Sequence, residues 1–149
     1  MNENNIALES SFMFRTAFPE IYEEICHKRK FFKLDIHLFA TALAIGILNN
    51  VTSTKKPTRD IIRLTQLFRD EHQEIKEVIN ILSQFAYTKP DKRARGESII
   101  AYSDGGLELL WKDVQTQGVL DLPRIIEDAK KKWPSRFPEV LALLERNEQ

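Results

Sequence analysis

The chain has 149 residues, of which 42% are hydrophobic and 30% are charged, so it is long enough to form one domain with a core and too apolar to be a disordered chain. Lysine and arginine together number 22, as do aspartate and glutamate, so the chain has no net charge. Overall charge therefore does not attract the protein to nucleic acid or to a membrane, and only local charged patches could do so. The one cysteine, Cys26, excludes an internal disulfide and a cysteine-based metal cluster.

The first 17 residues form an apolar leader, which we expect to be an arm ahead of a single domain at residues 18–149. The leader has no basic region followed by an apolar region, so it does not look like a secretory signal, and we expect a cytoplasmic protein. An apolar terminal segment packs either on its own domain or on a partner subunit. The side chains that would contact a partner are those of Phe12, Met13, Phe14 and Phe18.

The next segment predicts a helix from Pro19 to Lys30. Proline is favoured at the first helical position, because its missing N–H group would be unpaired there in any case. Glutamates occupy the first turns and basic residues the last turn, an order that complements the helix dipole.

The chain is organised around residues 36–48, where only His37 and Thr41 carry polar side chains. A helix that is apolar on nearly every side is one that other elements surround, and this stretch is too short for a membrane span, which needs about 20 residues. We expect Asp35 to cap its N-terminus and Asn49-Asn50 to close it. Its small residues leave room for neighbouring helices to approach: Ala40, Ala42, Ala44 and Gly46.

After a loop at residues 51–57, the stretch 58–67 predicts either a short helix or an irregular segment. Residues 70–86 predict a helix, because their apolar side chains recur at intervals of three and four. A basic surface loop at residues 87–96 follows, since proline and glycine bracket it.

Residues 97–115 predict a further helix that contains Gly105 and Gly106. Two glycines weaken an isolated helix by about 2 kcal/mol relative to alanine. Either another backbone packs closely on them, with the alanine-rich face of residues 36–48 as the candidate, or the helix breaks in two. Gly118 ends this segment, Asp121 caps a helix that reaches Lys132, and Pro138 opens a last helix.

No stretch shows convincing strand alternation, and no hairpin turn joins two apolar runs. The expected fold class is therefore all-α. We predict a single-domain helical bundle of about six helices around a buried central helix at residues 36–48.

The sequence contains no recognisable catalytic or metal-binding set, so we expect no enzyme activity, no cofactor and no metal. The three histidines show no metal-binding spacing. His37 is either a ligand or base or a hydrogen-bonded boundary residue of the core, and His72 is expected to lie in solvent. Cys26 and His27 are adjacent, but neighbouring residues on a helix point about 100° apart and do not pair.

Basic clusters at residues 28–33, 89–95 and 130–132 have the charge to contact phosphates, and they also serve solubility and the helix dipole. The cluster at residues 89–95 is the best candidate for contact with nucleic acid, because it lies in an exposed loop and is locally unbalanced. Its cations are Lys89, Lys92, Arg93 and Arg95.

Two segments resemble a known family. Residues 39–46 read Phe-Ala-Thr-Ala-Leu-Ala-Ile-Gly and resemble the Phe-Ala-Ala-Ala-Leu-Gly segment of small proteins encoded with bacterial DNA phosphorothioation (Dnd-type) modification and restriction systems. Residues 102–110, Tyr-Ser-Asp-Gly-Gly-Leu-Glu-Leu-Leu, are similar to the Tyr-Ala-Asn-Gly-Gly-Leu segment of that family. Ala44 stands where the family has glycine, and Asp104 replaces its asparagine.

The similarity spans residues 20–120, and its small residues are of the kind that lets helices pack closely: Ala40, Ala44, Gly105 and Gly106. The resemblance implies an accessory protein of a DNA-modification or anti-phage defence system and brings no catalytic residue. We expect a non-catalytic protein that acts through protein–protein contacts, as a homo-oligomer or as a subunit of such a system. The alternative is a nucleic-acid-binding module that contacts DNA through residues 89–95, and we expect neither a membrane nor a small-molecule substrate as a partner.

Overall fold

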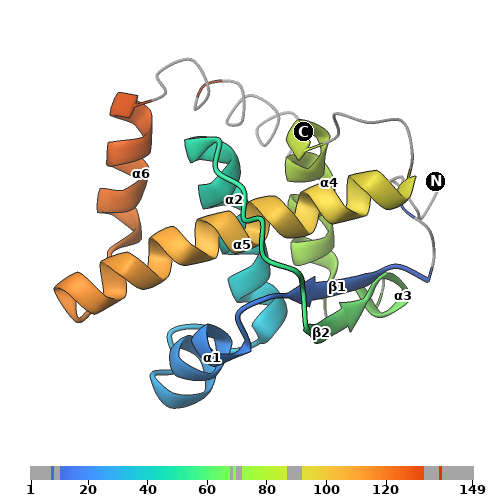
Figure 1. Ribbon diagram of the computed structural model, residues 1–149, viewed down its shortest axis with the longest axis horizontal. Helices are drawn as coiled ribbons and strands as arrows, with labels where there is room; N and C mark the ends of the chain where they lie inside the picture. The colour runs from blue at the N-terminus through green and yellow to red at the C-terminus, as the bar shows by residue number, and fades with distance from the viewer. Residues whose placement is uncertain are drawn as a thin grey trace.

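The computed structural model describes residues 8, 11–67, 69, 72–86, 92–132 and 138, and it is mostly helical with one small sheet (Figure 1). Figure 1 shows α5 crossing the molecule in front of α2, with α6 toward one end of α5 and the sheet and α4 toward the other. Within the described residues, the elements follow in this order: β1 (Met13–Thr16), α1 (Pro19–Tyr22), η1 (Glu23–Lys28), α2 (Asp35–Asn49), β2 (Arg59–Arg63), α3 (Leu64–Leu67), α4 (Gln73–Ala86), α5 (Lys92–Gln117) and α6 (Leu122–Lys132). The element labelled η1 is a π-helix.

Helix α2 is the buried centre of the fold, as the apolar run at residues 36–48 predicts. The predicted N-cap is wrong by one residue: Leu34 has the extended backbone of a cap, and Asp35 lies in the first turn, where its carboxylate complements the helix dipole. The predicted end is confirmed, because Asn50 adopts a left-handed backbone with a φ of 53°. The following large side chains of α2 have no exposed surface: Leu38, Phe39, Leu43 and Ile47.

Helices α2 and α5 cross in direct backbone contact. A Cβ atom added to Gly106 would lie 2.6 Å from the backbone nitrogen of Gly46 and closer still to the carbonyl oxygen of Ala42. This contact offsets the low helix propensity of two adjacent glycines, so α5 runs unbroken from Lys92 to Gln117. The predicted approach of the central helix is therefore confirmed, and the alternative of a broken helix is not what the chain adopts.

The four residues predicted to permit close packing contribute unequally. Gly105 and Gly106 both lie at backbone contacts, and a Cβ atom on Gly105 would lie 2.5 Å from the carbonyl oxygen of Val51. Ala40 is buried, whereas Ala44 is half-buried and packs against the margin of the core. The two helices therefore touch mainly through the glycine faces.

A two-stranded antiparallel sheet accompanies the helices, so the expected fold class is confirmed in its helical part, but the fold is not purely all-α. Strand β1 pairs with β2 from Met13 opposite Arg63 to Thr16 opposite Arg59, with a bulge next to Phe14. Burial alternates along the four residues of β1, but no such alternation runs along β2, because the bulge shifts its register. The ambiguous stretch at residues 58–67 divides into β2 and the single-turn helix α3.

The predicted N-terminal arm is part of the domain wherever the structure describes it. Phe14 is fully buried, and its ring packs edge-on against Phe39 with 5.2 Å between the ring centroids. Phe18 is also buried, whereas Phe12 and Met13 are partly exposed. Phe14 and Phe18 thus complete the core of their own chain and leave little surface for a partner. Residues 1–7, 9 and 10 of the arm lie outside the described residues.

The helix predicted for residues 19–30 forms, but its second half is the π-helix η1. The N–H group of Arg29 donates to the carbonyl oxygen of Glu24, five residues earlier, at 2.9 Å. A π-turn holds one residue more than an α-turn. Beyond it the backbone of Lys30 is left-handed, with a φ of 55°, and the chain leaves the helix.

The remaining helices largely follow the predicted boundaries. Helix α4 begins at Gln73, slightly later than the predicted residue 70, and α6 is capped by Asp121, whose carboxylate accepts from the Arg124 N–H at 3.2 Å. The prediction that His72 lies in solvent is wrong, because that side chain is buried.

Of the last predicted helix, only Pro138 is described, and the rest lies outside the described residues. Within the part of the chain that the structure describes, no helix combines the length and apolarity of a membrane span.

Candidate functional site

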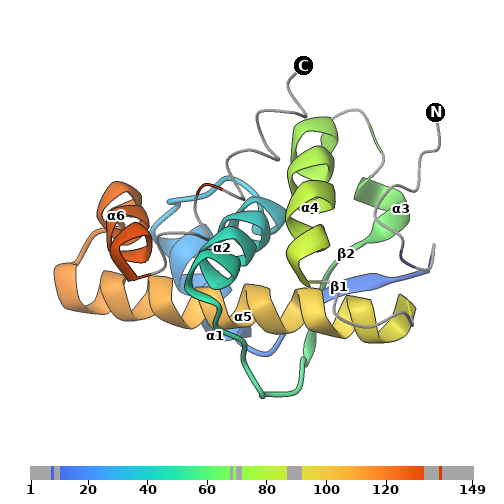
Figure 2. The same cartoon turned by 90° about the horizontal axis from the view of Figure 1, so that it is seen from above.

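A groove of about 800 Å³ lies between strand β1, the loop at residues 51–57 and the first half of helix α5. Residues 11–13 with Arg15 form one wall, residues 53–57 form a second, and Glu97, Ile100 and Ala101 form the third. Figures 1 and 2 show the loop passing across α5 on its way from α2 to β2. Three segments that are far apart in sequence therefore enclose one open channel.

The outer edge of β1 faces this groove. Alternate residues of a strand point their N–H and C=O groups to opposite edges. The carbonyl oxygen of Thr16 accepts from the Thr58 N–H at 2.9 Å, and that of Phe12 accepts at 2.8 Å from the residue that follows β2. The even-numbered peptide groups thus face β2, and those of Met13 and Arg15 face away from it. In the described part of the chain, these outward groups have no hydrogen-bond partner.

A buried carboxylate joins the end of β1 to α5. Asp104 is 1% exposed, and it accepts from the Thr16 hydroxyl at 2.7 Å and from the Ala17 N–H at 2.9 Å. Burial raises the pKa of Asp104, and the two hydrogen bonds only partly oppose that rise. The Ala17 bond shows that the backbone just after β1 turns toward α5, so Asp104 holds the end of the strand on the helix.

The loop wall is fixed to α5 by its backbone. The N–H group of Ser53 donates to the carbonyl oxygen of Ala101 at 2.9 Å, and the Ser53 hydroxyl accepts from the Lys55 N–H at 3.2 Å. Gly105 lets the start of the loop lie directly on the helix, because any side chain there would meet Val51. The loop that forms this wall of the groove is therefore fixed in position on α5.

Cations outnumber carboxylates along the groove. Arg15, Lys55 and Lys56 line it, and Glu97 is the one acidic residue among the lining residues. Arg15 also pairs at 2.8 Å with Asp60 of β2, and the Lys55 ammonium lies 5.1 Å from the centroid of the Phe18 ring. Both lysines are exposed. The groove thus offers an unpaired strand edge in a locally positive setting.

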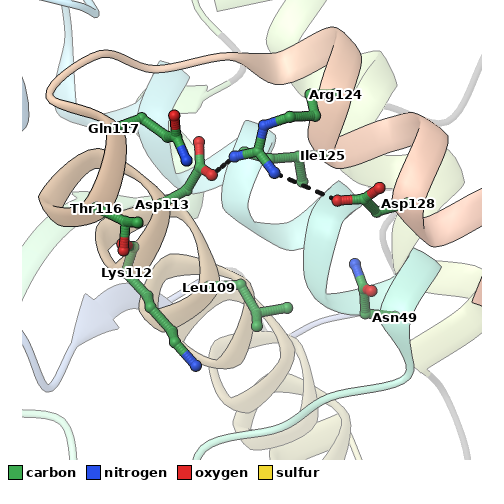
Figure 3. Close-up of a pocket in the computed structure, with 9 residues that line it drawn as sticks. All are labelled: Asn49, Leu109, Lys112, Asp113, Thr116, Gln117, Arg124, Ile125 and Asp128. Atoms are coloured by element: carbon green, nitrogen blue, oxygen red, sulfur yellow. Dashed lines mark hydrogen bonds and ion pairs between the residues drawn. The ribbon is translucent and has the colours of Figure 1, made fainter.

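A second pocket, of about 300 Å³, lies where α5, α6 and the end of α2 meet (Figure 3). Figure 3 shows the guanidinium of Arg124 reaching from α6 between Asp113 of α5 and Asp128, with which it forms an ion pair of 3.3 Å. The Asp113 side chain is only 10% exposed and pairs with the same guanidinium. Arg124 already pairs with the acidic side chains of this pocket, so their role is to hold α6 on α5.

The cations predicted to contact nucleic acid do not lie in a loop together. Helix α5 begins at Lys92, so Lys92, Arg93 and Arg95 belong to its first turns, and the prediction of a surface loop through residue 96 is wrong there. Arg95 is half-buried, and Lys89 lies outside the described residues. The sequence reasoning missed the cations of the groove, although the Lys55-Lys56 pair ahead of a proline in a polar loop was a visible signal.

The residues that suggest chemistry do not converge on one site. Burial, followed by the nearby Asp35 carboxylate, raises the pKa of Cys26 to about 12, so its thiol stays protonated. Burial also lowers the pKa of the half-buried His37. His27 lies 3.3 Å from Asp35, which pairs with Arg59 at 2.7 Å. Among the described residues, no group of three acidic, histidine or cysteine side chains is arranged to hold a metal ion.

No protein-family model, curated protein or solved structure matches this chain. The resemblance to the Dnd-associated proteins therefore rests on the sequence itself, above all on residues 39–46 and 102–110. These two segments meet at the crossing of α2 and α5, where Gly46 and Gly106 are in contact. Both segments therefore supply small residues to the same contact between two helices.

Proposed function

We propose that this protein is a non-catalytic interaction protein that binds an extended, acidic segment of a partner protein along the outer edge of β1. The observation that carries the proposal is the pair of outward peptide groups at Met13 and Arg15, which open onto a groove lined by basic side chains.

An exposed strand edge is a template for another strand. Each unpaired N–H and C=O group on it gains a partner when an extended peptide aligns beside it, and pockets for alternate side chains then provide selectivity. Met13, Pro57 and Ile100 supply apolar surface in the groove, and Arg15, Lys55 and Lys56 supply positive charge. An extended segment with alternating apolar and acidic residues is complementary to both.

The biological setting that we propose comes from the family resemblance. The chain would act as an accessory protein of a bacterial DNA-modification or anti-phage defence system, in the cytoplasm, with another subunit of that system as the partner. The burial of Phe14 and Phe18 removes these two side chains as contact surface, so the arm would meet a partner through the outer edge of β1 and the partly exposed Phe12 and Met13 in the groove.

Selection from a library of random linear peptides, followed by fluorescence anisotropy on the recovered sequences, tests the proposal. We expect recovered peptides to be rich in Asp and Glu and to lose affinity when a backbone nitrogen that pairs with β1 is methylated. The double variant Lys55→Glu/Lys56→Glu should weaken binding by at least tenfold, since about 1.4 kcal/mol corresponds to that factor.

The matched control is Lys131→Glu/Lys132→Glu, which makes the same change in charge at exposed positions on α6. This control should bind peptides as the wild type does. Enrichment of basic peptides, or equal losses in the two double variants, would overturn the proposed groove.

A further inference from the structure

A second surface lies where η1 ends and the chain runs on to α2. We define the basic loop as residues 28–34, which read Lys-Arg-Lys-Phe-Phe-Lys-Leu. Every one of these side chains except that of Phe32 is exposed. The loop contains four cations and no carboxylate.

Two of these cations have no partner within the described residues. Lys28 and Arg29 both lie near Glu24, at 3.1 and 3.8 Å, so one carboxylate partly balances them. No ion pair or hydrogen bond engages the side chains of Lys30 and Lys33. The loop therefore carries uncompensated positive charge at its centre.

An aromatic ring is presented in the middle of this charge. Phe31 is 39% exposed, and Leu34 at the end of the same loop is 40% exposed. The N–H group of Phe31 donates to the carbonyl oxygen of Ile25 at 2.9 Å, and the left-handed backbone of Lys30 turns the chain just before it. The backbone of the loop is thus held in place, and the Phe31 ring stands at the surface between Lys30 and Lys33.

We propose that the basic loop binds single-stranded nucleic acid. Phosphates would lie against the cations, and one base would stack on the face of Phe31, the combination that binding sites for single strands use. The exposed Phe31 ring favours a single strand over a duplex, because the bases of a duplex are already stacked and paired and cannot stack on the ring. Arg29 lies over the Trp111 ring at 5.9 Å and is therefore positioned as a further phosphate contact beside an aromatic surface.

This inference is independent of the proposed peptide groove. The two surfaces share no residue, and the exposed glutamates Glu20 and Glu23 of α1 and η1 belong to neither. Loss of one binding activity in a loop variant should leave the other intact, so the two proposals fail separately.

Fluorescence anisotropy of labelled single-stranded oligothymidine and oligouridine, measured between about 50 and 200 mM salt, tests the proposal. If all four cations contact phosphates, the logarithm of the binding constant should fall with that of the salt concentration with a slope of about −2.8. The double variant Lys30→Gln/Lys33→Gln should reduce the size of this slope by about 1.4. Lys131→Gln/Lys132→Gln is the matched control and should leave the slope unchanged.

The variant Phe31→Leu separates stacking from apolar insertion, because leucine keeps the apolar surface and loses the flat ring. We expect it to weaken binding of oligonucleotides at least about fivefold without changing the slope, and its circular dichroism should match that of the wild type. Equal affinity for duplex DNA, or an affinity that Phe31→Leu leaves unchanged, would overturn the proposal. Binding of phosphatidylserine vesicles by wild type and Phe31→Leu alike, with no binding of oligonucleotides, would assign the loop to a lipid surface instead.

Discussion

The contact between α2 and α5 makes a sharp prediction for Gly106→Ala. In an exposed helix this change would stabilise the fold by about 1 kcal/mol, because alanine has the higher helix propensity. Here the new methyl group would lie 2.6 Å from the backbone nitrogen of Gly46, where an ordinary contact begins at 3.4 Å. The two helices must then separate by at least 0.8 Å, the difference between these distances.

The cost of this separation exceeds the gain in propensity. A gap of about 0.5 to 1 Å forfeits a quarter to a half of the dispersion energy of each atom pair across it. Overpacking of a core costs about 1 to 3 kcal/mol or more, and in this case the obstacle is backbone, which cannot change rotamer. We expect a net loss of about 2 kcal/mol in the free energy of unfolding, which corresponds to a fall of about 4 to 8 °C in Tm.

Urea unfolding followed by circular dichroism measures this loss. Gly96→Ala is the matched control on the same helix, because the atoms nearest to its methyl group would belong to the ring of Phe12, a side chain that can move, and not to backbone. We expect the control to lose less stability than Gly106→Ala. A Gly106→Ala variant as stable as the wild type would refute the view that the crossing depends on the absence of a side chain.

Three further outcomes follow from buried polar groups. Burial raises the pKa of Asp104 above its ordinary value of 3.8, so the unfolded chain ionises first and the free energy of unfolding should fall as pH rises above 3.8 until the raised folded pKa is passed. Asp104→Asn should remove that pH dependence in urea titrations made at several pH values. Because burial and Asp35 raise the pKa of Cys26 to about 12, a thiol reagent at pH 8 should label native protein only as fast as the chain unfolds, and rapid labelling without urea would contradict this. Arg124→Met should lower the free energy of unfolding by about 1 to 3 kcal/mol, because it leaves Asp113 buried without its partner, and an unchanged Tm would show that this ion pair does not hold α6.

The elements that sequence predicts best are those with one dominant signal. The run from Ile36 to Leu48 has almost no polar residue, so its position at the centre of the fold follows from the hydrophobic effect alone. Gly105 and Gly106 predicted a close approach because nothing else would offset their cost, and Gly46 provides it. Asp121 is predictable as a cap because Pro123 lies near the start of the helix that follows it.

The sheet could not be predicted in the same way, because its strands are stabilised by non-local contacts. Strand β1 has only four residues, and the pairing of Met13 with Arg63 spans 50 positions of sequence. The two aliphatic residues of β2, Ile61 and Ile62, are adjacent, so they suit a helix as well as a strand with a bulge. Tertiary pairing decided the outcome.

The candidate site was missed for a related reason. The groove combines a strand edge, a loop and a helix, and only folding brings Arg15 within one channel with Lys55 and Lys56. Sequence reasoning instead favoured the densest cluster of cations in one stretch, residues 89–95, where helix α5 begins. Local charge density locates a basic segment but does not show which segments share a surface.

The π-turn of η1 sets the direction in which the chain enters the basic loop. The wider π-turn accommodates one residue more than an α-turn, so deleting one residue from Glu23–Lys28 and returning to α-helical geometry would rotate the chain by nearly the same amount. Such a deletion would leave Phe31 pointing in much the same direction. Related chains could therefore gain or lose a single residue at this turn while the aromatic surface keeps its place, whereas a deletion in the loop after Lys28 would not be absorbed in this way.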